Sequence, residues 1–330
     1  MTHPALRRCL VRSIAALLAA GAVAAPAAAL AQSYPNKPVK VIVTFPPGGT
    51  PDIYGRLLSQ ELSTLWKQSV VVENKTGASG TIGTDFVAKA APDGYTLLFA
   101  ADASVTIAPN LIANTPYNPV RDLTAIANVS AGPFIMMAHP SFPVNDLAGL
   151  IEAARRQPGK ITYASSGSGG QQHLSMEVIK QRAGLDIVHI PYKGFGQGIQ
   201  DVMAGHVPLI FGGITASIQL TKSGKLKAIA TTGPKRARVM PDVPAVAETL
   251  PGFRIEAWYG FMGPAGLPRD LVTKIHADVM TIANRPDFQA RIIADGMEPV
   301  GGTPESFSRQ VADELREWGE LIKAAKIKAD

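Results

Sequence analysis

Runs of consecutive apolar residues alternate along the chain with segments whose apolar positions recur every three or four residues. The first run, residues 39–45 (VKVIVTF), is rich in β-branched residues and predicts a strand. The segment after it has helical spacing, with one apolar stripe made of Ile53, Leu57, Leu58, Leu62 and Leu65. Between the two stands a Pro/Gly corner, PPGGT, so the order strand, corner, helix is expected.

The same order returns several times. Residues 69–74 predict a short strand, and a Gly-rich loop, a helix and another strand follow up to residue 100. In the middle of the chain, strands are expected at 160–165, 187–192 and 207–213, with helices between them. Strands that lack strict alternation and are separated by helices predict an α/β fold with mostly parallel sheets, covered on both faces.

Two longer segments, residues 123–140 and 253–268, have the length to cross between domains. If both cross, the two ends of the chain form one lobe and the middle forms the other. The expected division is residues 32–132 plus 255–330 for the first lobe and 133–254 for the second. The C-terminus predicts a long amphipathic helix whose apolar face carries Phe307, Val311, Leu315, Trp318 and Leu321.

The first 31 residues have the pattern of a secretory signal peptide. A basic start is followed by an Ala-rich apolar run and by the small residues Ala29-Leu30-Ala31, which suit cleavage after Ala31. Cys9, the one cysteine of the sequence, lies inside this segment. We therefore expect a mature, cysteine-free protein outside the cytoplasm, in an oxidising compartment such as the periplasm.

Removal of the signal changes the charge of the chain. Without its three arginines, 29 basic residues face 26 acidic ones, so the net charge falls from +6 to +3. A mixed surface of this kind does not predict nucleic-acid binding. The compact basic run at 235–238 is expected to be a solvated loop.

The PPGGT corner suits an anion. Gly48 and Gly49 let the backbone approach a ligand, and a helix start offers unpaired N–H groups with a partial positive charge. Asp52 is placed to cap the helix and to pair with Arg56 one turn later. A plain strand–helix turn without a ligand would use the same residues, so the corner alone does not decide between the two.

A second Gly-rich corner, SSGSGGQQH, lies in the middle of the chain. Its hydroxyls and freed amides precede a helix, and Lys193 in a nearby loop could face an anion. His173 makes a Ser/His pair with Ser166 or Ser168 conceivable, but the spacing is not that of a nucleophile elbow and no third member is indicated. A packing role for His173 is the simpler interpretation.

Motifs for cofactors are missing from the sequence. There is no G-x-x-x-x-G-K-[ST], Gln172 replaces the third Gly of a dinucleotide fingerprint, and the histidines lack metal-ligand spacing. We expect no cofactor and no metal. Anion-friendly corners in both halves of an exported α/β protein favour capture of a ligand over catalysis.

Beyond the signal, the chain resembles the Bug/TctC family, the extracytoplasmic solute-binding proteins of tripartite tricarboxylate transporters. The matching stretches are YPNKPVKVIVTFPPGGTPDI, VVVENKTGASGTIGTDFVAKAAPDGYTLL, PYNPVRDLTAIANV, ITYASSGSGGQQHL, IVHIPYKG, TTGPKRARVMPDVPAVAET, AWYGFMGPAG and EPVGGTPESF. They run in order along nearly the whole mature length.

The resemblance implies a periplasmic-binding-protein fold of type II, with two α/β lobes joined by hinge strands. It implies a small carboxylate as ligand, such as a di- or tricarboxylate, an acidic amino acid or an aromatic acid. The family holds a carboxylate largely through backbone amides and ordered water. Membrane subunits of a tripartite transporter are the implied partners, and a monomer is expected.

The positions that match the family's binding motifs come from both lobes. Those of the first lobe are Phe45, Pro46, Pro47, Gly48, Gly49, Thr50, Ala103 and Ser104. Those of the second lobe are Ser165, Ser166, Gly167, Ser168, Gly169, Gly170, Gln171, Lys193 and Gly194. Aromatic residues that could widen the choice to aromatic acids, or equally belong to the core, are Phe45, Phe134, Phe195 and Trp258, and we expect Phe134 to be core.

Three positions depart from the family pattern. Pro51 removes one amide donor at the helix start, and Pro208 and Gly212 stand where many members carry acids. These changes concern the identity of the ligand. Two other functions remain open on the sequence: a periplasmic sensor component that signals to a membrane kinase, and a Ser-dependent hydrolase.

Overall fold

Two strands, β4 (Leu123–Ala138) and β9 (Glu256–Pro264), pair antiparallel and connect the two halves of the molecule. The computed structural model describes residues 34–325 and 327. The predicted signal peptide, residues 1–31, lies outside the described part of the chain. Both lobes belong to the unit that begins at Lys37.

The other strands are short, as the predicted pattern requires. They are β1 (Val39–Val43), β2 (Val70–Asn74), β3 (Thr96–Ala101), β5 (Thr162–Ser165), β6 (Val188–Pro191), β7 (Leu209–Gly213), β8 (Lys227–Thr231) and β10 (Glu298–Pro299).

The helices fill most of the intervals between strands. In the N-terminal half they are α2 (Thr50–Trp66), η1 (Ala78–Gly80), α3 (Thr81–Ala88), η2 (Ala103–Ile107), α4 (Ala108–Leu111) and α5 (Pro119–Asp122). The middle of the chain contributes α6 (Leu147–Arg156), α7 (Gln171–Ala183), α8 (Phe195–Met203), α9 (Ile214–Lys222) and α10 (Val246–Thr249). The last three are α11 (Arg269–Ala283), α12 (Pro286–Ala294) and α13 (Pro304–Ala324).

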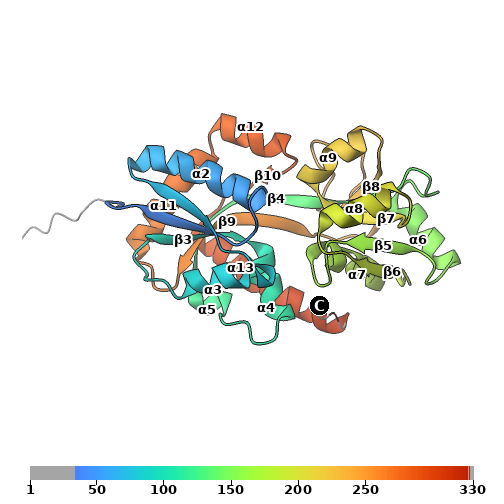
Figure 1. Cartoon of the computed structure of the whole chain (residues 1–330), viewed down its shortest axis with the longest axis horizontal. Coiled ribbons are helices and arrows are strands. Elements are labelled where there is room, and N and C mark those ends of the chain that lie inside the picture. Colours follow the sequence, from blue (N-terminus) through green and yellow to red (C-terminus); the bar gives the residue numbers. More distant parts are fainter. Residues whose placement is uncertain (1–33, 326, 328–330) are drawn as a thin grey trace, which may run out of the picture. The chain divides into compact units, whose positions relative to one another are not determined.

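The sheet divides at β4. The strand order is β2-β1-β3-β9-β4-β7-β5-β6, with β8 and β10 paired to β4 outside this path. β4 pairs with β9 up to Pro133 and with β7 from Phe134 onward. Figure 1 shows the consequence: the blue N-terminal strands and orange-red C-terminal helices share one lobe, and the green and yellow middle of the chain forms the other.

The predicted parallel pairing is found within each lobe but not between them. β1 pairs parallel with β2 and β3, and β5 pairs parallel with β6 and β7. The ladders that involve β4 and β9 are antiparallel. A segment that leaves the first lobe and one that returns to it run in opposite directions, so their pairing is antiparallel by necessity.

The buried face of helix α2 differs from the apolar stripe that the sequence predicted. Leu58 and Leu62 are buried as expected, but Ile53 and Leu65 are 40% and 46% exposed. Tyr54 and Gly55 take the inner face instead. A Cβ at Gly55 would stand 2.9 Å from Val43 Cγ2, so the glycine lets the helix approach the sheet more closely than a side chain would permit.

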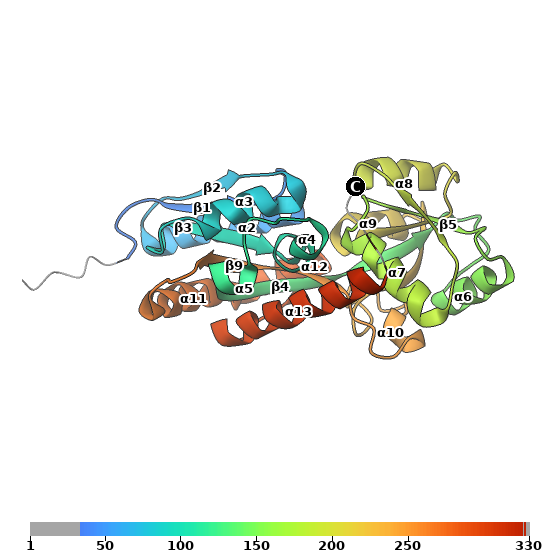
Figure 2. The same cartoon turned by 90° about the horizontal axis from the view of Figure 1, so that it is seen from below.

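Helix α13 reaches from one lobe to the other. Phe307 and Val311 pack in the core of the first lobe, whereas Trp318 and Leu321 pack against the core of the second. Figure 2 shows the red helix running from the β4 and β9 region to α7. The predicted C-terminal amphipathic helix is therefore present, and its apolar face is shared between the lobes.

Two lobes joined by hinge strands are present, but the numbered division at 132/133 and 254/255 stays a prediction. Among the described residues, no helix combines the length and apolar character needed to cross a bilayer.

The close pairing of β4 and β9 gives a first testable prediction. A methyl group at Gly260 would lie 2.4 Å from Ala127 O and 3.0 Å from Asn128 Cα, both backbone atoms. Gly260→Ala is therefore expected to lower the free energy of unfolding by about 1–3 kcal/mol, the usual cost of overpacking. Urea unfolding measures the effect.

The control is Gly301→Ala, because the added methyl would meet Met280 Cε at an ordinary 3.7 Å and the residue has no left-handed φ. That variant should stay within about 0.5 kcal/mol of the parent. Equal losses in both variants would contradict a special constraint at the crossing strands.

Candidate functional site: loops of both lobes at the ends of β1, β3 and β5

The first-lobe corner follows β1 and is exposed. Pro46 to Gly49 face solvent, Gly48 adopts a left-handed φ of +84°, and α2 begins at Thr50. Gly49 is the N-cap and has no side-chain cap, while Pro51 occupies the first turn. The predicted strand, corner and helix start are all present.

This corner uses some of its own amides. Gly48 N–H donates to Asp52 Oδ2 over 3.0 Å, and Gly49 N–H donates to Pro46 O over 3.4 Å. Asp52 therefore holds the loop. The sequence had predicted that it caps α2, and that prediction is wrong. An anion at this corner must rely on other groups, among them the Thr50 side chain and the remaining amides of the helix start.

Asp52 is the anchor of the corner. It accepts hydrogen bonds from Arg56 Nε (3.0 Å) and Asn74 Nδ2 (2.8 Å) in addition to Gly48 N–H. Burial raises the pKa of Asp52, but the hydrogen bonds from Arg56, Gly48 and Asn74 outweigh it and lower the pKa overall. Asp52 is thus held as a carboxylate and keeps the corner in one shape.

The loop after β3 carries the predicted residues Ala103 and Ser104. Ser104 is buried, its hydroxyl donates to Ala101 O over 3.0 Å, and Tyr117 Oη donates to its carbonyl. The Ser104 side chain therefore supports the loop. Asp102, one residue before Ala103, is 1% exposed and was not predicted as a site residue.

The second-lobe loop runs from Ser165 to Gln171. Ser165 Oγ donates to Gly167 O (3.0 Å) and accepts from Gly167 N–H (3.2 Å), so it closes a tight turn. Gly167 and Gly169 both have positive φ, at +134° and +76°. Such angles are costly for other residues, which explains the Gly-rich sequence.

The loop after β3 and the second-lobe loop contact each other. Gln171 Nε2 donates to Asp102 Oδ2, a contact between α7 of the second lobe and the end of β3 in the first. A Cβ at Gly169 would stand 2.6 Å from Leu111 Cδ1 of α4, so the loop also approaches the first lobe closely there. The structure thus brings Gln171 to Asp102, the residue before Ala103, and Gly169 to α4.

Thr50 is connected to the same place through Tyr259 on β9. Burial and the nearby Asp102 carboxyl raise the pKa of Tyr259, and the neighbouring Thr50 side chain lowers it by less. Tyr259 therefore lies near both Thr50 and Asp102, and Asp102 accepts from Gln171 of the second lobe. Tyr259 lies in a segment predicted only as a crossing strand.

Asp102 is an acidic group in an apolar and acidic setting. Burial raises its pKa first, and the Glu314 carboxyl of α13 raises it further. Glu314 accepts hydrogen bonds from Trp258 Nε1 (2.6 Å) and Gln310 Nε2 (2.8 Å), yet burial raises its pKa as well. A polar residue directly after an apolar strand was the signal in the sequence that could have identified Asp102.

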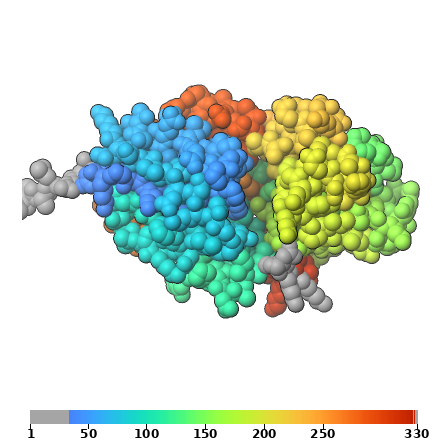
Figure 3. Space-filling model, in the orientation of Figure 1, coloured from blue at the N-terminus to red at the C-terminus, as the bar shows by residue number. Residues whose placement is uncertain are grey.

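Lys193 and Gly194 lie beside the turn of the second-lobe loop. Tyr192 N–H donates to Ser165 O over 3.1 Å, and a Cβ at Gly167 would be 3.8 Å from Tyr192 O. Lys193 is exposed. Figure 3 shows the surface hollowed between the blue N-terminal residues and the yellow-green residues of the second lobe.

The aromatic residues fall into two groups. Phe134 and Trp258 are 5% and 1% exposed and belong to the two cores, as expected for Phe134. Phe45 and Phe195 are partly buried. A Cβ at Gly212 would stand 2.7 Å from Phe195 Cε2, so this glycine makes room for the Phe195 ring.

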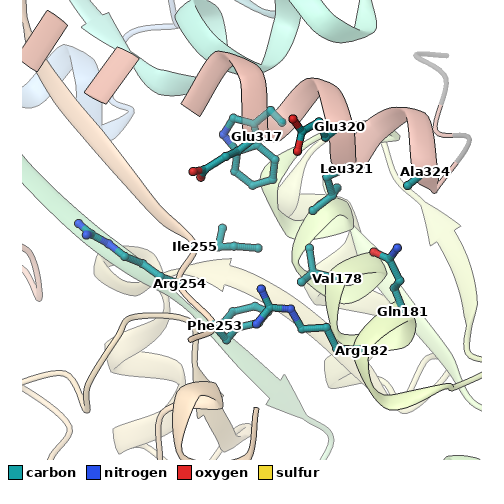
Figure 4. A pocket seen from close by; sticks show the side chains of 11 residues that line it. Val178, Gln181, Arg182, Phe253, Arg254, Ile255, Glu317, Glu320, Leu321 and Ala324 are labelled. Atoms are coloured by element: carbon teal, nitrogen blue, oxygen red, sulfur yellow. The ribbon is translucent and has the colours of Figure 1, made fainter. Parts of the chain in front are cut away.

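A well-formed cavity lies elsewhere, between α13 and α7. It has a volume of about 390 Å³, and Figure 4 shows Arg182 and Gln181 of α7, Phe253 to Ile255, and Glu317 and Glu320 of α13 around it. None of the predicted binding residues lines it. Its walls combine α13 with α7 and residues 253–255.

No group of three or more His, Cys, Asp or Glu side chains in the described part of the chain is arranged to hold a metal ion.

Comparison with known proteins agrees with this architecture. The model of the TctC family, described as "Tripartite tricarboxylate transporter family receptor", matches residues 54–327. Protein BugT of Bordetella pertussis is 32% identical over 323 residues, which cover 97% of this chain and 98% of that protein.

Solved structures with the same fold include the periplasmic binding protein BugD, with 34% identity and a TM-score of 0.76 over 90% of this chain and 100% of that one. R. palustris Rpa4515 with adipate has 31% identity and a TM-score of 0.79 over 89% and 99%. MatC of Rhodopseudomonas palustris with bound malate has 29% identity and a TM-score of 0.75 over 88% and 100%.

The fold is thus that of the periplasmic solute-binding proteins, two α/β lobes joined by crossing strands. More narrowly, the chain belongs to the Bug/TctC family, the receptors of tripartite tricarboxylate transporters.

The buried acid gives a prediction with a defined pH dependence. The folded-state pKa of Asp102 is raised, so the folded protein binds the proton more tightly than the unfolded chain does. Stability of the parent is therefore expected to fall as pH rises from about 4 through the folded pKa, by up to about 1.4 kcal/mol per pH unit. Asp102→Asn keeps an acceptor for Gln171 but does not titrate.

The stability of Asp102→Asn relative to the parent should accordingly increase with pH, as measured by urea unfolding at pH 4.5, 6.0 and 7.5. Glu314→Gln, alone and combined with Asp102→Asn, separates the contribution of Glu314, which is coupled to Asp102. A difference that stays constant over this range would contradict the assignment of a raised pKa to Asp102.

Proposed function

We propose that this chain is a periplasmic solute-binding protein that captures a small carboxylate between its two lobes. The observation that carries the proposal is the meeting of the loops after β3 and β5 through Asp102 and Gln171. Relatives with the same fold were solved with adipate and with malate, which supports a carboxylate as the ligand class.

Each lobe offers different donors. The first contributes the start of α2 and the Thr50 hydroxyl. The second contributes its Gly-rich loop and the exposed ammonium group of Lys193, which suits the negative charge of a carboxylate. A ligand that touches both sets binds the closed form more tightly than the open form, and this difference in affinity drives closure.

The serines and histidines favour capture over hydrolysis. Ser165 is fully buried, and its hydroxyl is occupied by Gly167 and by His189 Nε2 at 2.6 Å. His173 Nδ1 accepts a hydrogen bond from Gly169 N–H, which occupies the lone pair that a general base would need. This use of Nδ1 argues against His173 as a general base for Ser166 or Ser168.

Export and delivery complete the proposal. The N-terminal sequence has the pattern of a signal peptide with cleavage after Ala31, and family membership fits a location in the periplasm. The loaded protein would then dock as a monomer on membrane subunits of a tripartite tricarboxylate transporter. This step follows from membership in the family.

A carboxylate panel tests the capture step. At a concentration about 100-fold above its Kd, a ligand that binds only the folded state adds about 2.7 kcal/mol of stability, which raises the melting temperature by several degrees. Adipate, malate, glutamate, citrate and benzoate are tested by thermal unfolding, and a hit by small-angle scattering, where compaction is expected.

Adipamide is the matched control for adipate, since it has the same chain length without the charges. If no carboxylate stabilised the mature protein, or if adipamide stabilised it equally, carboxylate capture would be rejected.

Pro51 tests the first-lobe corner. It lies buried in the first turn of α2 and lacks the N–H that most residues would present there. Pro51→Thr restores one donor, so the Kd of the bound carboxylate should fall by a factor of about 2–10, the range for one net hydrogen bond. Isothermal titration calorimetry measures it.

Pro286→Thr is the control, because Pro286 also lies in the first turn of a helix, α12, and is not one of the predicted binding residues. An unchanged Kd in Pro51→Thr would place the ligand away from the start of α2.

A further inference from the structure

Three aromatic rings stack directly beneath the Ser165–Gln171 loop. Tyr163 of β5 and His189 of β6 have ring centroids 4.9 Å apart, and His189 and His173 of α7 have centroids 3.9 Å apart with planes inclined by 11°. Two of these rings bond the loop itself. The stacked rings therefore support the loop through hydrogen bonds that involve His173 and His189.

His173 holds the loop near its C-terminal end. Gly169 N–H donates to Nδ1 over 2.9 Å, so Nδ1 carries the lone pair and the neutral ring is protonated on Nε2. Nε2 lies 3.7 Å from Glu177 Oε1. Gly169 is the residue whose backbone approaches Leu111 of the first lobe, so this hydrogen bond fixes the part of the loop that contacts the other lobe.

His189 holds the loop at its start. Its Nε2 lies 2.6 Å from Ser165 Oγ, and the Ser165 hydroxyl donates to Gly167 O over 3.0 Å. Because the Ser165 hydroxyl proton is used in the bond to Gly167 O, His189 Nε2 donates its N–H to Ser165 Oγ. Gly167 and Gly169 adopt left-handed backbone angles and have no side chains to anchor them, so the two histidines supply the anchors.

We infer that His173 and His189 are positioning residues for ligand capture, which hold the second-lobe loop in the shape that meets the first lobe. The inference rests on the proposed function for its link to a ligand. Neither ring needs to touch the carboxylate. Their contribution is to present Gly169, Gly170 and Gln171 at a fixed place.

Protonation of His173 would remove this support. An imidazolium has N–H groups at both nitrogens, so Nδ1 would then face Gly169 N–H as donor against donor. Groups beside the ring include Glu177 of α7, Tyr163 of β5 and His189 of β6. The Glu177 carboxylate, 3.7 Å from Nε2, favours the charged ring, and its Oε1 also accepts from Tyr163 Oη (3.2 Å) and Lys180 Nζ (2.7 Å).

Two substitutions at position 173 distinguish the role of the hydrogen-bond acceptor from the role of the ring's volume. Asn at position 173 places Oδ1 near the position of Nδ1, so His173→Asn keeps an acceptor for Gly169 N–H that does not titrate. His173→Leu fills the space without an acceptor. His206→Asn is the control histidine, in the same lobe with a largely exposed side chain paired to Asp201.

Adipate is the probe, and calorimetric titration at pH 7.5, 6.75 and 6.0 is the measurement. The parent and His206→Asn should lose affinity as pH falls, approaching tenfold per pH unit below the pKa of a histidine. His173→Asn should bind at pH 7.5 like the parent and lose much less at pH 6.0, while His173→Leu should bind weakly at every pH. Comparison between variants cancels the titration of adipate itself.

A readout without ligand distinguishes this inference from the proposed function. In ¹⁵N spectra of the free protein, the Gly169 amide should shift with pH in the parent and not in His173→Asn. If that shift is seen but no carboxylate binds, the positioning role stands and the proposed function fails. Identical pH profiles of parent and His173→Asn, or a Gly169 amide that ignores pH, would overturn the inference.

Discussion

The antiparallel pairing of β4 with β9 is the constraint on which the rest of the fold depends. It is the place where the chain leaves the first lobe and returns to it, and glycine at position 260 lets the two backbones come close. Because β4 changes partners between Pro133 and Phe134, one strand contributes to both halves of the sheet. Two connections of this kind restrict the lobes to hinge-like motion rather than free tumbling.

The crossing strands also place the acidic groups. Trp258 and Tyr259 are neighbours on β9: one bonds Glu314 of α13, and the other lies near Asp102. The Asp102 carboxyl accepts a hydrogen bond from Gln171 Nε2 of the opposite lobe. A buried acid at the seam is costly unless it is paired, so this contact couples the relative position of the lobes to the polar network behind it.

The elements were predictable because their periodicity is local. The strand–corner–helix units, the crossing segments and the C-terminal helix lie where the pattern placed them, and the family resemblance is confirmed by the matching family model. The stripe of α2 was wrong at Ile53 and Leu65, because the close approach at Gly55 depends on the facing strand, which a helical stripe does not contain.

The candidate site was predictable only as loops. The sequence pointed to the corners at 45–50 and 165–171, but not to Asp102, Tyr259 or the ring stack under the second loop. Those groups act through contacts between residues far apart in sequence, such as Asp102 with Gln171 or Ser165 with His189. Asp52 likewise was expected to cap α2, and only the folded loop shows that it bonds Gly48 N–H instead.

The central claim is that one carboxylate is held by corners of both lobes at once. A crystal structure of the mature protein with the carboxylate that stabilises it most tests this directly. The account predicts ligand oxygens within hydrogen-bond distance of the start of α2 and of the Ser165–Gln171 loop in the same molecule. A ligand held by one lobe alone, or seated in the cavity between α7 and α13, would contradict it.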